Sequence, residues 1–484
     1  MSEIISLDNY ADGANIGSMN DVTLLKKALE AGYEAGTGVS SDVLKVQSLE
    51  KTLKNVQYKE RDMAFWLTVP KLKATSTVEE YNRLDSYGDD TGGSFVEGDA
   101  PEGIDASYSR QVELVKYYGV TKEVTHAAQL VSTNVGDLQM HAATTGTKWL
   151  LRKVDRSLAM SDARIVPTEV NGFRALHRNS FATFAAWDDS EYVRDLRGKR
   201  MVEDDLEDGS ELLVSDGHAA PDTLIAAPAV LSGFVKQYRE SKYIQPNTPQ
   251  VSGAIMGQRV KKFESQFTTI DLMYDKFIRQ TPRKSTDGAT STKAPATPVP
   301  DATTPFNVVT DASNKYGVDF EGDYFIGVAA INRYGMSAIA MFDPAVISIA
   351  ATESVDLKFA AGAGTYAATG YVIFRSEVDP TGALADTNLY PILEVSTAEL
   401  AAGFDGAAVG VVRDRNRTIP NTYIAFLTEN DTEVWSVKQL APLMKMPLAR
   451  VGTSDKFMIL MYFTPQLYAP KKMVLYKNIG SRVP

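Results

Sequence analysis

Residues 61–120 constrain the fold more than any other stretch, because they are poorly suited to forming a core of their own. A glycine-dense centre, Tyr87–Gly103, separates two limbs, Lys73–Tyr87 and Ile104–Val120, which are polar and alternate only in part. Two extended limbs around a glycine-rich tip predict a long β-hairpin. Such a hairpin leaves unpaired backbone edges, so it is stabilised most by lying on another surface.

Residues 1–60 are predicted to form an N-terminal arm that contains two short helices. In Asp21–Ala35 and Asp42–Val56 the apolar residues recur at helical spacing, and glycines separate the two runs. Each helix has an apolar stripe with little nearby sequence to cover it. The arm is therefore expected to dock either on a distant part of the chain or on a neighbouring copy.

Residues 121–162 are predicted to form the longest helix. Apolar residues recur at steps of three to five positions from Val124 to Leu158. At about 1.5 Å per residue, a helix of about 35 residues would span roughly 50 Å. Gly136 and Gly146 lie inside it, where each glycine costs about 1 kcal/mol relative to alanine, and one of the two is expected to mark either a bend or a close contact.

The next two regions, 163–215 and 216–280, are predicted to differ in their content of regular secondary structure. Residues 163–215 are interpreted as loop-rich, and the acidic run Glu203–Asp208 as a solvated loop, because its spacing does not match a calcium-binding loop. Residues 216–280 are expected to form a compact αβ unit. Its predicted elements are the strand Asp222–Ala227, the helix Ala229–Ser241 after Pro228, and the strands Val251–Phe267 and Ile270–Ile278.

A change of composition divides the second half of the chain. Residues 281–305 are rich in Pro, Thr, Ser and Ala and predict a linker. Residues 306–413 carry short apolar runs at roughly ten-residue spacing, which is typical of a small β-sandwich. The predicted strands are Tyr324–Ala330, Ser337–Phe342, Val346–Ala350, Ser354–Phe359, Gly370–Ser376 and Pro391–Val395. Mixed αβ character returns over 414–484, so the sandwich is predicted to be inserted into a host domain.

The composition excludes several kinds of chemistry. The chain has no cysteine and four histidines, which form no metal-binding pair motif. His218 beside Asp216 is interpreted as a surface turn, and no catalytic, cofactor-binding or metal-binding residue is predicted. A carboxylate pair for glycoside hydrolysis stays open, because such a pair is defined by its separation in space.

Charge and hydropathy exclude further classes of protein. The net charge of −11 argues against broad binding of nucleic-acid phosphates. No apolar stretch is long enough to predict a membrane span, and no secretory signal is expected at the start of the sequence.

Several short phrases occur along the chain in an informative order. They are LEKTLKN (Leu49–Asn55), the run Trp66–Pro70, STVEEY (Ser76–Tyr81), GGSFVEGDAP (Gly92–Pro101) and DTLIAAPAVLS (Asp222–Ser232). With the order of the parts, they resemble the major capsid proteins of tailed bacteriophages, which have the Hong Kong 97 phage capsid fold. At Gly322–Ser337 and Gly370–Ser376 the inserted segment resembles an immunoglobulin-like or fibronectin type III-like module.

The resemblance implies an α+β chain of the phage major capsid fold plus an inserted all-β sandwich. The implied parts are an N-terminal arm (1–60), an extended hairpin loop (61–120), a spine helix and peripheral domain (121–215), the first part of an axial domain (216–280), a linker (281–305), the inserted domain (306–413), and the completion of the axial and peripheral domains (414–484).

The implied function is structural: self-assembly through hexamers and pentamers into an icosahedral head shell. The implied location is the capsid of the virion, assembled in the bacterial host cytoplasm. Other copies of the chain, a portal protein and a separate scaffolding or cement protein are the implied partners. Packaged DNA would be enclosed without specific binding, and neither a cofactor nor a membrane is implied.

Seven residues are predicted to stabilise the subunit or its contacts. Phe65 and Trp66 are expected to hold the base of the hairpin, and Trp149 to pin the long helix to the β-layer behind it. Near the hairpin tip, the side chains expected either to pair with charges on a neighbour or to be solvated are Arg83, Glu97, Asp99 and Glu102.

Two other functions stay open. The chain could be a decoration or tail protein of a virion, in which the β-sandwich is the working part. It could also be a carbohydrate-active enzyme with an accessory β-sandwich module. The long hairpin and the spine helix argue against both, because neither function requires them.

Overall fold

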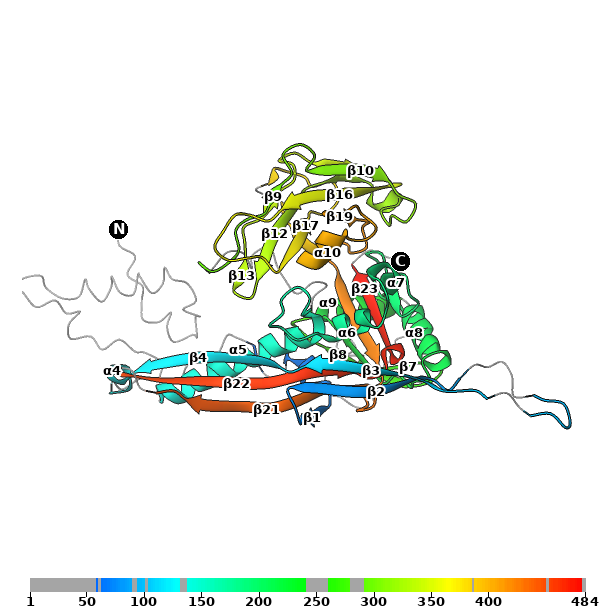
Figure 1. Ribbon diagram of the computed structural model, residues 1–484, viewed down its shortest axis with the longest axis horizontal. Coiled ribbons are helices and arrows are strands. Elements are labelled where there is room, and N and C mark those ends of the chain that lie inside the picture. Colours follow the sequence, from blue (N-terminus) through cyan, green and yellow to red (C-terminus); the bar gives the residue numbers. More distant parts are fainter. Residues whose placement is uncertain are drawn as a thin grey trace, which may run out of the picture. The chain divides into compact units, whose positions relative to one another are not determined.

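The computed structural model describes residues 58–59, 62–88, 94–100, 103–130, 137–240, 260–278, 291–384, 387–449 and 452–480, which form an α+β structure (Figure 1). The predicted arm helices Asp21–Ala35 and Asp42–Val56, and most of the predicted strand Val251–Phe267, lie outside these residues.

The first host sheet has four strands in the order β1-β21-β22-β4. They are β1 (Lys71–Lys73), β21 (Trp435–Pro447), β22 (Ser454–Leu467) and β4 (Lys116–Thr125). The helix α5 (Leu138–Met160) packs on this sheet through Leu150, Val154 and Leu158, which are buried in one cluster with residues of β22. At Gly146 an added Cβ would lie 2.7 Å from Cδ1 of Ile459, so this glycine marks a close contact.

The long helix predicted over 121–162 is wrong in its first part. Residues 121–125 belong to β4, a short helix α4 covers His126–Leu130, and α5 starts after Asp137, whose carboxylate accepts the N–H of Gln139 at 2.8 Å. In β4 the buried and half-buried side chains alternate with exposed ones, and the whole strand pairs with β22. For residues 121–125, pairing with β22 therefore outweighed the helical spacing of their apolar side chains.

The second host sheet has six strands in the order β5-β23-β20-β6-β8-β7. They are β5 (Val193–Asp195), β23 (Met473–Ile479), β20 (Tyr423–Thr428), β6 (Thr223–Ala226), β8 (Thr269–Tyr274) and β7 (Lys262–Glu264). The antiparallel pairing of β6 with β20 joins segments about two hundred residues apart. The stretches of chain on either side of residues 306–413 thus build one sheet.

Residues 163–215, predicted to be loop-rich, contain three helices: α6 (Phe173–Asn179), α7 (Phe184–Asp188) and α8 (Glu203–Ser215). The acidic run predicted as a loop forms the first turns of α8. Negative charges at a helix N-terminus are stabilised by the helix dipole. The carboxylate of Asp205 also accepts the N–H of Val202 at 2.8 Å, which caps the helix.

Residues 299–414 form a separate group of strands. They are β9 (Val299–Pro300), β10 (Phe306–Thr310), β11 (Gly322–Tyr324), β12 (Ile326–Asn332), β13 (Gly335–Met336), β14 (Ala340–Met341), β15 (Ile347–Ile349), β16 (Glu353–Ala360), β17 (Gly370–Arg375), β18 (Tyr390–Ser396) and β19 (Val411–Asp414), with the helix α10 (Thr397–Ala402) before β19. One sheet has the order β10-β16-β19 and another the order β13-β12-β17-β18. Side chains of both, such as Leu357 and Val328, share one buried cluster.

This inserted group is docked on the host. The strands β12 and β17 are buried along their whole length. Their second face packs on host residues, because Ala329, Val372 and Phe374 form a buried cluster with Ile165 and Val166. A sheet covered on both faces is held against its host by apolar packing.

A buried cluster of charges adds to this contact. Asp188 of α7 is 2% exposed and pairs with Lys477 of β23, with Arg417 at 2.8 Å and with Lys315 of the insert at 2.9 Å. Burial by itself would raise the pKa of Asp188, but Lys477, Lys315 and Arg417 hold it well below its usual range. The cluster connects host and insert at one carboxylate.

We predict that Asp188→Asn lowers the free energy of unfolding by about 3 kcal/mol at pH 7, because it leaves the buried Lys477 ammonium without its main partner. Since the folded pKa of Asp188 is depressed, its contribution is present above the unfolded value of about 3.9 and is lost as the pH falls below it. Urea unfolding at several pH values measures both effects.

Asp189→Asn is the matched control. Asp189 is the next residue, contacts Lys315 and Arg417, and its side chain is 51% exposed. Its loss should cost no more than about 1 kcal/mol. Equal destabilisation by the two variants would contradict the role assigned to Asp188.

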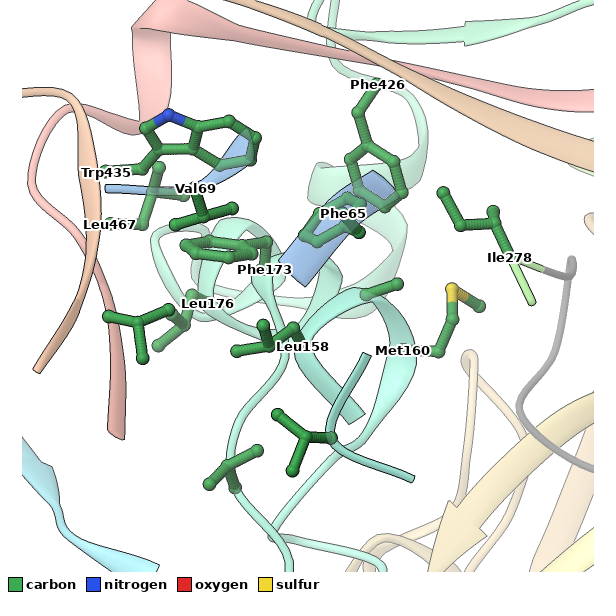
Figure 2. Close-up of a cluster of buried hydrophobic side chains, with 14 of the residues drawn as sticks. Phe65, Val69, Leu158, Met160, Phe173, Leu176, Ile278, Phe426, Trp435 and Leu467 are labelled. Atoms are coloured by element: carbon green, nitrogen blue, oxygen red, sulfur yellow. The ribbon is translucent and has the colours of Figure 1, made fainter. Parts of the chain in front are cut away.

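The largest core centres on Phe65 of the short helix α3 (Ala64–Thr68), as Figure 2 shows. The ring of Phe65 is fully buried and lies 5.4–5.6 Å from the rings of Phe173, Phe426 and Trp435. These partners come from α6, β20 and β21, so a single side chain joins a host helix and both host sheets.

We predict that Phe65→Ala lowers the free energy of unfolding by roughly 3–5 kcal/mol, the usual cost of removing a buried aromatic ring. Leu67→Ala in the same helix is the control, because Leu67 is 56% exposed and should change stability by less than about 0.5 kcal/mol. Chemical denaturation measures both. Similar values for the two variants would show that the Phe65 cluster is not the main core.

Candidate assembly interface

The predicted hairpin is present as a two-stranded antiparallel ribbon of β2 (Val78–Ser86) and β3 (Ser107–Leu114) (Figure 1). It is shorter than the predicted range 61–120. The chain before it forms α3 and β1, and the chain after it forms β4. No third strand pairs with the ribbon in the described part of the chain.

One face of the ribbon is seated on its own subunit. The hydroxyl of Tyr81 donates to the backbone carbonyl of Leu467 at 2.8 Å, and its ring meets that of Tyr468 edge-on at 4.8 Å. Glu113 on the same face accepts a hydrogen bond from the side-chain amide of Asn171 at 3.1 Å. The ribbon therefore has a defined seat close to the end of β22.

The opposite face is apolar and exposed. It carries the side chains that we call the hairpin stripe: Val78, Leu84, Tyr108, Val112 and Leu114, which are 39–73% exposed. Val78 lies opposite Leu114 and Leu84 opposite Tyr108, so apolar residues face each other across the strands. Glu80 and Arg110 form an exposed ion pair on this face. The stripe has two parts, with Asn82 opposite Arg110 between the pairs at its base and the pair Leu84–Tyr108. Exposed apolar groups gathered on one face indicate a surface that contacts another molecule.

The predicted charged contacts lie as follows. Arg83 pairs with Asp85 of its own strand at 2.5 Å. Glu97 and Asp99 are exposed beyond the ribbon, and Glu102 lies outside the described residues. The structure thus gives Arg83 a partner inside the subunit. Contacts of Glu97 and Asp99 with a neighbouring copy stay a prediction.

The structure corrects the prediction for Trp149. Its side chain is 42% exposed, because the buried face of α5 is made by Leu150, Val154 and Leu158. Phe65 is fully buried, and that it holds the base of the hairpin stays a prediction. Trp66 is half-buried, and its backbone N–H donates to the Asp155 carboxylate at 2.8 Å.

Two tryptophans that sequence reasoning did not select are the buried ones. Trp187 and Trp435 are 1% and 0% exposed. The indole of Trp187 donates to Nδ1 of His177 at 2.8 Å, and burial lowers the pKa of this histidine to about 4. Trp435 is the first residue of β21, and the apolar residues Val434 and Val437 beside it are the sequence signal for its burial.

Two carboxyl groups come close together at α3. Asp155 and Asp275 are 1% and 0% exposed, and they accept the backbone N–H groups of Trp66 and Phe65 at 2.8 and 2.9 Å. Burial, with the neighbouring Asp275, raises the pKa of Asp155 well above its usual range. Because both acids are enclosed and bind backbone, they anchor α3 and are not open to a sugar substrate.

Two other features are absent from the part of the chain that the structure describes. It contains no group of three or more His, Asp or Glu side chains placed to hold a metal ion. It also contains no helix long and apolar enough to cross a membrane.

No protein-family model matches the chain. The chain is 23% identical over 463 residues to the major capsid proteins of Staphylococcus phage K and Staphylococcus phage S25-3, and each alignment covers 94% of both chains. Among solved structures it is similar to the capsid of Myoviridae phage XM1, with 6% identity, 92% and 99% of the two chains covered and a TM-score of 0.40. On the evidence of the two sequence alignments, the chain is a homologue of phage major capsid proteins.

Proposed function

We propose that the chain is the structural subunit of a phage head shell and that the hairpin stripe is one of the surfaces joining its copies. The observation that carries the second part is the ribbon with two different faces. One face is seated by Tyr81 and Glu113, while the other exposes five apolar side chains. Burying apolar surface contributes about 25 cal/mol per Å². A contact in which a neighbouring copy covers the stripe would therefore be stabilised.

The arrangement suits a closed assembly. Copies related by closed symmetry repeat the same contact many times, and weak contacts then add up to a stable shell. We propose that the shell is icosahedral and built from hexamers and pentamers, and that it assembles in the host cytoplasm. A portal protein and a separate scaffolding or cement protein belong to the same proposal.

The net charge of −11 bears on the contents of the shell. An acidic wall repels DNA phosphates, so we propose that DNA is enclosed without specific binding. We also propose that the chain has a structural role and no enzymatic one. Purified shells should then fail to retain short duplex DNA at moderate salt in a filter-binding assay. Retention that weakens steeply with added salt would contradict this part of the proposal.

The two rival functions are less well supported. A decoration or tail protein would use the inserted strands as its working surface, yet one face of these strands is buried against Ile165 and Val166 of the host. A carbohydrate-active enzyme would need an accessible pair of acids, and the neighbouring acids Asp155 and Asp275 are too enclosed to be that pair.

We predict that Val112→Asp abolishes shell formation but leaves the subunit folded. The new carboxylate would be exposed in the free subunit and buried without a partner in the interface, which costs several kcal/mol per contact. Negative-stain imaging and size-exclusion chromatography measure assembly, and the melting temperature measures folding.

Val409→Asp is the matched control. Val409 is 78% exposed and lies in the inserted part, between α10 and β19 and outside the strands of the ribbon. This variant should form shells as well as the unmodified chain does. Closed shells from the Val112→Asp variant would show that the stripe is not buried between copies, and unmodified protein that never forms particles would overturn the function itself.

A further inference from the structure

The seated face of the hairpin contains a partly buried acid that no cation neutralises directly. Among the described residues Glu113 has no ion-pair partner within contact distance. Its carboxylate instead accepts the Asn171 amide, at 3.1 Å to Oε2 and 3.5 Å to Oε1. The amide oxygen of Asn171 accepts the N–H of Ala163 at 3.0 Å, which fixes the amide in place. Glu113 therefore connects the ribbon to the loop before α6.

Among the described residues, no charged neighbour forms an ion pair with the Glu113 carboxylate. Glu79 lies directly opposite on β2. Its carboxylate accepts the backbone N–H groups of Thr75 and Ser76 at 2.7 and 3.0 Å. Burial works to raise the pKa of Glu79, but these donors and Lys438 of β21 hold it below its usual range, so Glu79 stays ionised.

Two further groups complete the surroundings. Lys116 at the start of β4 donates to the carbonyl of Pro167 at 2.8 Å, so it acts on Glu113 only through space. Burial and the nearby Glu113 raise the pKa of Tyr81 above its usual range, so its hydroxyl stays protonated. Glu113 is thus the group on this face that changes charge near neutral pH. Burial raises its pKa to about 7, against the opposing effects of Asn171 and Lys116.

We propose that Glu113 is a proton-controlled latch, which seats the hairpin on its own subunit when protonated and releases it when ionised. A neutral carboxyl group can stay in the half-buried site and accept the Asn171 amide. An ionised one gains more from water than from the seat, since no cation of the described residues contacts it. Release would change how the hairpin stripe is exposed to a neighbouring copy. This consequence rests on the proposed function, whereas the latch itself does not.

The direction of the effect follows from linkage. The seated state has the raised pKa and binds more protons than the released state, whose glutamate titrates near 4.3. The seating constant should therefore fall about tenfold per pH unit between roughly pH 4.3 and pH 7 and level off above pH 7. Acidic conditions favour the seated hairpin, and neutral to alkaline conditions favour the released one.

Hydrogen–deuterium exchange of unassembled, full-length subunits tests the latch. Protection of the β2 and β3 amides, corrected for intrinsic exchange rates, should fall along this profile in the unmodified chain. In Glu113→Gln, which keeps the hydrogen-bond acceptor but cannot ionise, protection should stay high from pH 5 to pH 8. The same pH profile in both proteins would overturn the proposal, as would a Glu113→Gln hairpin that is less protected at pH 8.

Glu80→Gln is the matched control. It removes the same charge from the ribbon, but on the exposed face, where Glu80 pairs with Arg110. It should keep the pH profile of the unmodified chain, and a flattened profile would assign the effect to the overall charge of the ribbon. Because exchange is measured before assembly, failure of the latch and failure of shell formation are separate results.

Discussion

The subunit depends on the way the short helix α3 is fixed. Its Phe65 ring is packed among aromatic rings from α6, β20 and β21, and its first N–H groups are bound by the buried carboxyl groups of Asp155 and Asp275. These acids stand on α5 and directly after β8. Five elements therefore hold one turn of helix, and the chain that leaves it towards β1 and the hairpin starts from a rigid base. A hairpin without a core of its own needs such a base, since few contacts along its length can fix its direction.

The hairpin itself shows how a β-ribbon can serve two surfaces at once. Side chains alternate between the faces of a strand, so neighbouring positions can carry different tasks. Tyr81 and Glu113 point to the subunit, whereas Val112 and Leu114 are exposed. The polar character seen in the sequence belongs largely to the seated face and the tip, and the apolar stripe is visible only when the register of β2 with β3 is known.

The inserted strands are more closely tied to the host than an ornament would be. An apolar contact at Ile165 and Val166 and a buried carboxylate at Asp188 meet the insert at different places. Breaking a buried ion pair by removing one partner is costly, because the remaining charge has lost both water and its counter-ion. The insert and the host are therefore expected to lose their structure together.

The sequence alone determined the parts that depend on local pattern and on order along the chain. The runs Ser354–Phe359 and Gly370–Ser376 match β16 and β17 to within one residue, and the glycine-rich tip between two limbs predicted the ribbon. The resemblance to phage capsid proteins, carried by short phrases in a fixed order, agrees with the homologues found. Tertiary structure decided what local pattern cannot: that residues 121–125 join β22 as a strand, that Trp149 is exposed while Trp187 and Trp435 are buried, and that Glu113 faces Asn171. Each of these depends on segments far apart in the sequence, because burial and strand pairing are properties of the neighbours that folding brings together.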